Sequence, residues 1–132
     1  MTVKLANSPC SWGVAYPDAP NNPDAKKVFK EIAEAGYEFS ELGPYGFFEP
    51  DPQKILDFTQ NLNLNIIGSF IFDNLHIEAE QQRIKKTLSK SCALLQKINS
   101  KVIVVIDHIT KERMETSGNQ ELSVSLNNND YK

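Results

Sequence analysis

Two short stretches of the chain place acidic and basic side chains where an apolar run ends. Glu41 lies in the run 38–42, and a carboxylate within an apolar strand is costly to bury unless it is paired or used. Strand alternation places Glu41 on the same face as Phe39, where it could accept hydrogen bonds from substrate hydroxyls or form a structural ion pair with a lysine. Asp107 and His108 follow the run 101–106 and are a candidate acid/base or metal-ligand pair. Adjacent strand residues point to opposite faces, so these two converge only if the strand ends before them.

Two aromatic residues and one histidine add to these candidates. Trp12 is the only tryptophan, and its indole could stack on the apolar face of a sugar or pack on the next loop. Phe70 is a candidate for substrate contact, although phenylalanine in such a run more often belongs to the core. His76 most simply begins a helix, and a functional role is also open because Asp73 precedes it on the same side of the fold. The aromatic loop 44–48 could close over a ligand or cover an edge of the core.

Apolar periodicity indicates four strands that position these residues. Short apolar runs alternate with segments of helical spacing, which is typical of alternating strands and helices. The last run contains five consecutive β-branched residues, a pattern that predicts a strand buried on both faces. The four expected strands are Val3–Asn7, Glu38–Leu42, Leu64–Phe70 and Lys101–Ile106.

Three helices are expected between these strands. Asn22-Pro23-Asp24 supplies a cap and a proline suited to a first turn, and Gly36 suits the end of that helix. Asp51-Pro52 opens a second helix in the same way. A third helix is expected over about 76–98, with Cys92 as a small residue on its buried side.

The order βαβαβαβ predicts one parallel α/β sheet with right-handed crossovers. A (β/α)8 TIM barrel takes about 250 residues, or about thirty per βα unit, so 132 residues suit the first four units. We therefore expect a single domain over 1–132, the N-terminal half of such a barrel. Residues 109–132 are expected to be an irregular loop and the start of a truncated fourth helix, within Ser125–Lys132.

Composition restricts the partners. Fourteen basic and seventeen acidic residues give a net charge of −3, which argues against nucleic acid as a partner. No run approaches the roughly 20 apolar residues of a membrane helix, so a membrane partner is not expected. No secretion signal opens the chain, so the expected location is the cytoplasm. Cys10 and Cys92 are expected to stay reduced thiols.

Several motifs together resemble the xylose isomerase-like TIM barrels of the sugar phosphate isomerase/epimerase superfamily, and among them the myo-inosose-2 dehydratases. The resemblance covers residues 3–107. Its motifs are Asn7-Ser8-Pro9-Cys10-Ser11-Trp12-Gly13, Glu34-Ala35-Gly36-Tyr37-Glu38, Glu41-Leu42-Gly43-Pro44-Tyr45-Gly46 and Gly68-Ser69-Phe70.

The resemblance implies a parent enzyme that acts on a cyclitol or keto-sugar with a divalent metal, Mn, Co or Mg. Such barrels hold the metal with residues of their second half, so no metal ligand is expected in this chain, which should be inactive alone. The expected substrate-binding residues are Trp12, Glu41, Phe70, Asp107 and His108. The alternative is an inactive half-barrel that self-associates through its open sheet edges, as a homo-oligomer. An apurinic-endonuclease relative on the same barrel fits least, because the charge does not suit DNA.

Overall fold

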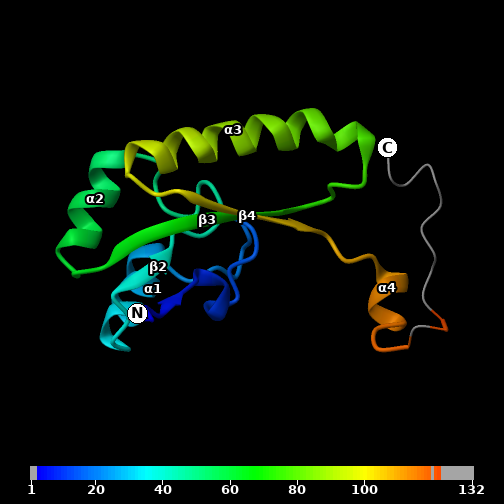
Figure 1. The fold of residues 1–132 in the computed structure, drawn as a ribbon, viewed down its shortest axis with the longest axis horizontal. Helices are drawn as coiled ribbons and strands as arrows, with labels where there is room; N and C mark the ends of the chain where they lie inside the picture. The colour runs from blue at the N-terminus through cyan, green and yellow to red at the C-terminus, as the bar shows by residue number, and fades with distance from the viewer. Residues whose placement is uncertain (1–2, 120, 123–132) are drawn as a thin grey trace.

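The computed structural model describes residues 3–119 and 121–122, and it contains one four-stranded parallel sheet (Figure 1). The strands pair in sequence order, β1-β2-β3-β4. The predicted α/β class with four parallel strands is therefore confirmed. Their bounds are β1 (Ala6–Asn7), β2 (Phe39–Glu41), β3 (Asn65–Asp73) and β4 (Val102–Asp107).

Helices alternate with the strands, and the first two begin at the predicted caps. The third begins at Gln81, so the prediction that it begins at about His76 is wrong, and His76 lies in the loop before it. Asp24 caps the first helix by accepting a hydrogen bond from the Lys27 amide, and Asp51 caps the second by accepting from the Gln53 and Lys54 amides. The residue two positions beyond the first helix, Gly36, has a positive φ of 88°. The helices are α1 (Ala25–Glu34), α2 (Pro52–Gln60), α3 (Gln81–Lys97) and α4 (Lys111–Glu115), with 3-10 turns η1 (Pro9–Trp12) and η2 (Glu78–Glu80).

One hydrophobic core joins α1, α2 and α3 to the same face of the sheet. Phe29 of α1 is fully buried and meets the ring of Phe48 edge-on, with 5.6 Å between ring centroids. Ile55 of α2 and Leu95 of α3 belong to the same cluster. In Figure 1, α3 runs alongside β3 and β4. A sheet whose crossovers all return on one side leaves its opposite face without helical cover.

The prediction that the last strand is buried on both faces is wrong. Of the residues of β4, Val102 and Val105 are each 50% exposed, and Val104 and Ile106 are 38% and 41% exposed. The reason is the strand's position: β4 is at the edge of the sheet and pairs only with β3. Only Ile103 packs against the core from this strand.

The predicted burial of Cys92 is also wrong, because the Cys92 thiol is exposed. Its neighbour Ser91 is buried and faces the sheet instead. Consecutive side chains of a helix differ in direction by about 100°, so Cys92 points away from the sheet. Cys10 and Cys92 are both free thiols.

The segment after β4 contains the short helix α4, which extends away from the sheet (Figure 1). The predicted start of a fourth helix within Ser125–Lys132 lies outside the described residues. Among the residues that the structure describes, no helix has the length and apolar character needed to cross a membrane.

Phe29→Ala should lower the free energy of unfolding by about 3–5 kcal/mol, because it leaves a cavity among α1, α2 and the loop before α2. Urea unfolding followed by circular dichroism measures this change. Val3→Ala, at a position that is 81% exposed, is the matched control and should shift stability by less than about 0.5 kcal/mol. Equal losses in the two variants would contradict the position of Phe29 in the core.

Candidate functional site

Two aspartates meet at the carboxyl ends of β3 and β4. The strand β3 runs three residues past its predicted end at Phe70 and reaches Asp73, which is the register partner of Asp107. The His108 amide donates to the Asp73 carbonyl over 2.9 Å and extends the ladder by one bond. In parallel α/β sheets this edge is where ligands bind.

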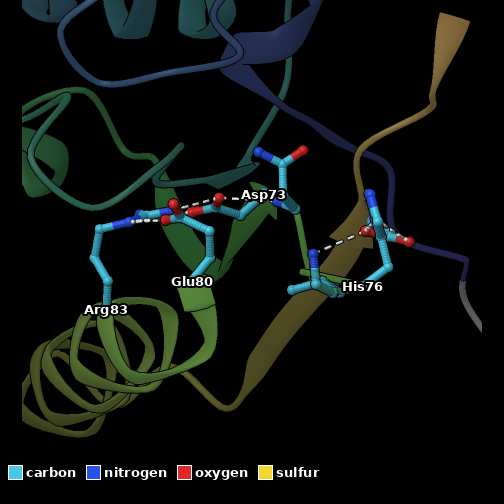
Figure 2. Close-up of polar contacts among 7 residues, drawn as sticks. Asp73, His76, Glu80 and Arg83 are labelled. Atoms are coloured by element: carbon cyan, nitrogen blue, oxygen red, sulfur yellow. Dashed lines mark hydrogen bonds and ion pairs between the residues drawn. The ribbon is translucent and has the colours of Figure 1, made fainter. Parts of the chain in front are cut away.

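Asp73 is held by a cation from α3 (Figure 2). Two nitrogens of the Arg83 guanidinium donate to its two carboxylate oxygens over 2.7 and 2.9 Å, and the Arg83 Nε donates to Glu80 over 2.7 Å. The Asn74 amide adds a bond of 2.9 Å. The hydrogen bonds from Arg83 outweigh burial and hold the pKa of Asp73 below its usual range. Asp73 is therefore an ionised anchor for the start of α3.

Asp107 is engaged by a histidine from the loop that follows β3 (Figure 2). The Nδ1 atom of His76 lies 2.9 Å from Oδ1 and 3.2 Å from Oδ2 of Asp107, and the Leu75 amide donates to Oδ1 over 2.8 Å. Burial raises the pKa of Asp107, but the hydrogen bonds from His76 and Leu75 together lower it below its usual range. About two fifths of each side chain stays exposed, 41% for His76 and 40% for Asp107.

His108 is on the other face of the sheet, in an aromatic stack. Its ring stacks on Phe72 with centroids 5.0 Å apart, and Tyr16 meets Phe72 at 5.6 Å. Burial, with the nearby charge of Asp73, raises the pKa of Tyr16. Asp107 and His108 therefore do not converge: the strand continues through Asp107, so alternation sends the two side chains to opposite faces.

Glu41 and Phe70 share the face that the helices leave uncovered. Ser40 is fully buried toward the helices, so alternation turns Glu41 to the opposite face, as predicted, beside its register partner Gly68. Across residues 3–119 and 121–122, no ion pair or hydrogen bond engages the Glu41 carboxylate, and the considered lysine pair is not formed there. Phe70 is 5% exposed and so belongs mainly to the packing.

Trp12 packs toward α1 and away from this face. Its indole N–H donates to the Glu31 carboxylate over 2.6 Å, and the ring packs against the core. The aromatic loop 44–48 also covers the core, because Phe48 packs between Phe29 and Phe58. For Trp12 and for the loop 44–48, these contacts match the interpretation that the side chains pack on the protein itself.

Neither the role of Arg83 nor the pair between His76 and Asp107 was predicted from the sequence. Arg83 comes ten residues after Asp73, in the first turn of α3. The loop between β3 and α3 places this first turn beside the end of the strand. The available signal was an acid at the end of an apolar run, followed by a basic residue in the first turn of the next helix. The thirty-one residues between His76 and Asp107 carry no local signal of their contact.

The described residues do not fit the divalent metal that the resemblance implies. No three His, Cys, Asp or Glu side chains in this part of the chain converge as metal ligands. Asp73 and Asp107 are the acids at the ends of β3 and β4. Both carboxylate oxygens of Asp73 accept hydrogen bonds from Arg83, so they are not available to a metal.

Comparisons with known proteins give no relative: no family model matches the chain, and neither a curated protein nor a solved structure matches it. The fold and the site geometry are therefore the basis for assigning a function.

Asp73→Asn should lower the free energy of unfolding by about 1 kcal/mol at pH 7, because it removes the charge that Arg83 pairs with. The folded-state pKa of Asp73 is lowered, so its contribution is present above the unfolded-state value of about 4 and is lost as pH falls through the folded value. Urea unfolding at several pH values should show the two proteins converging below pH about 4.

The control is Asp18→Asn, at an exposed carboxylate in the loop before α1. A difference between wild type and Asp73→Asn that stays constant down to the lowest pH would contradict an ion-pair role for Asp73.

Proposed function

We propose that this chain is the N-terminal part of a cytoplasmic, metal-dependent enzyme of the sugar isomerase/epimerase or inosose dehydratase kind. It binds a cyclitol or keto-sugar at the carboxyl ends of its strands. The observation that carries the proposal is the winding of the sheet: four parallel strands in sequence order, with three helices packed in one core. A doubly wound sheet reverses its strand order and is covered on both faces, whereas a barrel keeps sequence order and turns one face inward.

The uncovered face supplies groups that suit a polyol. The Glu41 carboxylate has no hydrogen-bond or ion-pair partner among the described residues. A carboxylate accepts hydrogen bonds, and the hydroxyls of a sugar can donate them. Nearer the strand ends, the rings of Tyr16, Phe72 and His108 present aromatic surface for the C–H side of a sugar ring. The three rings come from three separate parts of the chain, and Glu41 comes from a fourth.

The proposed reaction moves a proton on a carbon next to a carbonyl, which either isomerises the substrate or leads to loss of water. A divalent metal bound by the whole enzyme would stabilise the negative charge on the oxygens. The described residues of this chain are assigned the binding and orientation of the substrate.

The test is binding of 2-keto-myo-inositol to the purified chain, measured by calorimetry. We expect saturable binding, and Glu41→Gln should weaken it about tenfold because hydrogen bonds to a charged group are worth about 1.5–3 kcal/mol. Glu38→Gln is the matched control, since Glu38 is an exposed acid at the opposite end of β2. Absence of binding, or equal losses in both variants, would overturn the proposal.

A second candidate function is self-association of the chain as an inactive half-barrel. The observation that favours it is β4, which is apolar, partly exposed on both faces and unpaired along one edge within the described residues. In a two-fold dimer, β4 of one copy would lie parallel to β1 of the other at both junctions, closing an eight-stranded barrel.

Light scattering coupled to gel filtration tests this candidate. A dimer would have twice the 14.9 kDa mass of the chain, and Val105→Lys should shift it to monomer because it places a charge on the edge strand. Gln82→Lys, on the exposed surface of α3, is the control and should leave the mass unchanged. A wild-type monomer at micromolar concentration would exclude the dimer.

A further inference from the structure

We propose that His76 and Asp107 form a proton-transfer dyad, in which Nε2 of His76 accepts a proton from the substrate. The assignment of a polyol or keto-sugar as that substrate rests on the proposed function above. The dyad itself rests on three hydrogen-bond distances and on the exposure of the two side chains.

The geometry fixes which imidazole nitrogen carries the proton. An ionised carboxylate can only accept, so the contact between Nδ1 of His76 and Asp107 requires a proton on Nδ1. The lone pair of the neutral ring is then on Nε2. The Leu75 amide, 2.8 Å from Oδ1, holds the carboxylate in place, so Asp107 acts as a positioning residue for the imidazole.

A purely structural clamp would not need this pair. The end of β3 is already joined to α3 by the two hydrogen bonds between Asp73 and Arg83. The loop that follows is joined to β4 by the bond from the Leu75 amide to the Asp107 carboxylate, which does not involve His76. A clamp also gains from burial, because water weakens an exposed pair, yet the His76 and Asp107 side chains are 41% and 40% exposed. The exposure leaves the imidazole open to solutes at the carboxyl edge of the sheet, where ligands bind. Asp107 is on the helix-bearing side of β4, so a substrate held by Glu41 on the other face reaches His76 only by extending over the strand ends.

The proton balance is simple. Nε2 of His76 takes the proton from the carbon next to the substrate carbonyl, and the electron pair of that C–H bond becomes the double bond of an enediolate. The imidazolium is stabilised by the Asp107 charge. The same proton then returns to the former carbonyl carbon, while the hydroxyl proton of the deprotonated carbon moves to the former carbonyl oxygen, which gives isomerisation. Alternatively the proton goes to a hydroxyl on the next carbon, which leaves as water while the carbonyl re-forms. The ring ends neutral in both cases.

The test uses acylation of histidine by diethyl pyrocarbonate on the full chain, which has only two histidines. The unprotonated nitrogen attacks a carbonyl of the reagent and forms an N–C bond; ethyl carbonate departs and decomposes to ethanol and carbon dioxide. The Nδ1 proton passes to Asp107 or to water. Peptide mass spectrometry then gives separate rates for His76 and His108.

We expect His76 to react faster than His108, whose ring is stacked on Phe72. Asp107→Asn should slow the reaction of His76 about tenfold, because the neutral amide no longer stabilises the cationic ring. Asp57→Asn, at an exposed carboxylate on α2, is the control and should leave the rate unchanged. Equal rates for His76 in wild type and Asp107→Asn would overturn the dyad.

Nitrogen-15 NMR of the wild-type chain tests the same assignment without any variant. The expected spectrum of neutral His76 has the proton on Nδ1, and a proton on Nε2 would overturn the proposal. Neither measurement needs a sugar. A reactive dyad in a chain that does not bind 2-keto-myo-inositol would therefore support the dyad and reject only the proposed substrate.

Discussion

The parallel register between β3 and β4 is the constraint on which the rest of the candidate site depends. It pairs Gly68 with Val102 at one end and Asp73 with Asp107 at the other. A Cβ at Gly68 would lie 2.7 Å from the Val102 carbonyl oxygen, so the close approach of the two strands requires glycine at the start of this ladder. With that end fixed, the two carboxylates arrive side by side at the edge where a parallel sheet binds ligands.

Asp73 and Asp107 both accept hydrogen bonds as carboxylates, but they bind different parts of the chain. Asp73 accepts a bidentate pair from Arg83 and so joins the strand end to the first turn of α3. Asp107 accepts from the Leu75 amide and contacts the Nδ1 atom of His76 in the loop that follows β3. Both carboxylates have lowered pKa values because hydrogen-bond donors surround their ionised forms. The edge is therefore charged, and it is ordered by contacts within the chain itself.

The same winding that creates this edge leaves one face of the sheet without helices. Helices α1, α2 and α3 share a single core, so Glu41, Phe72 and His108 lie on the opposite side. A barrel would enclose that face, and the exposed strand β4 would gain a second neighbour. The proposed substrate site and the proposed dimer both depend on this face without helices. In the first the face belongs to the barrel of a longer enzyme, and in the second a second copy of the chain completes the barrel.

The sequence by itself determined the elements, because their signals are local. The caps Asp24 and Asp51 start helices within a few residues, and the face of Glu41 follows from the two-residue period of a strand. Only the tertiary structure decided that β4 is an edge strand with exposed valines, that Ser91 and not Cys92 faces the sheet, and that Trp12 binds Glu31. It also decided that Asp107 pairs with His76 and not with His108. The physical reason is that neighbours across a sheet are set by strand order and register, and residues that are thirty-one positions apart carry no local signal of their contact.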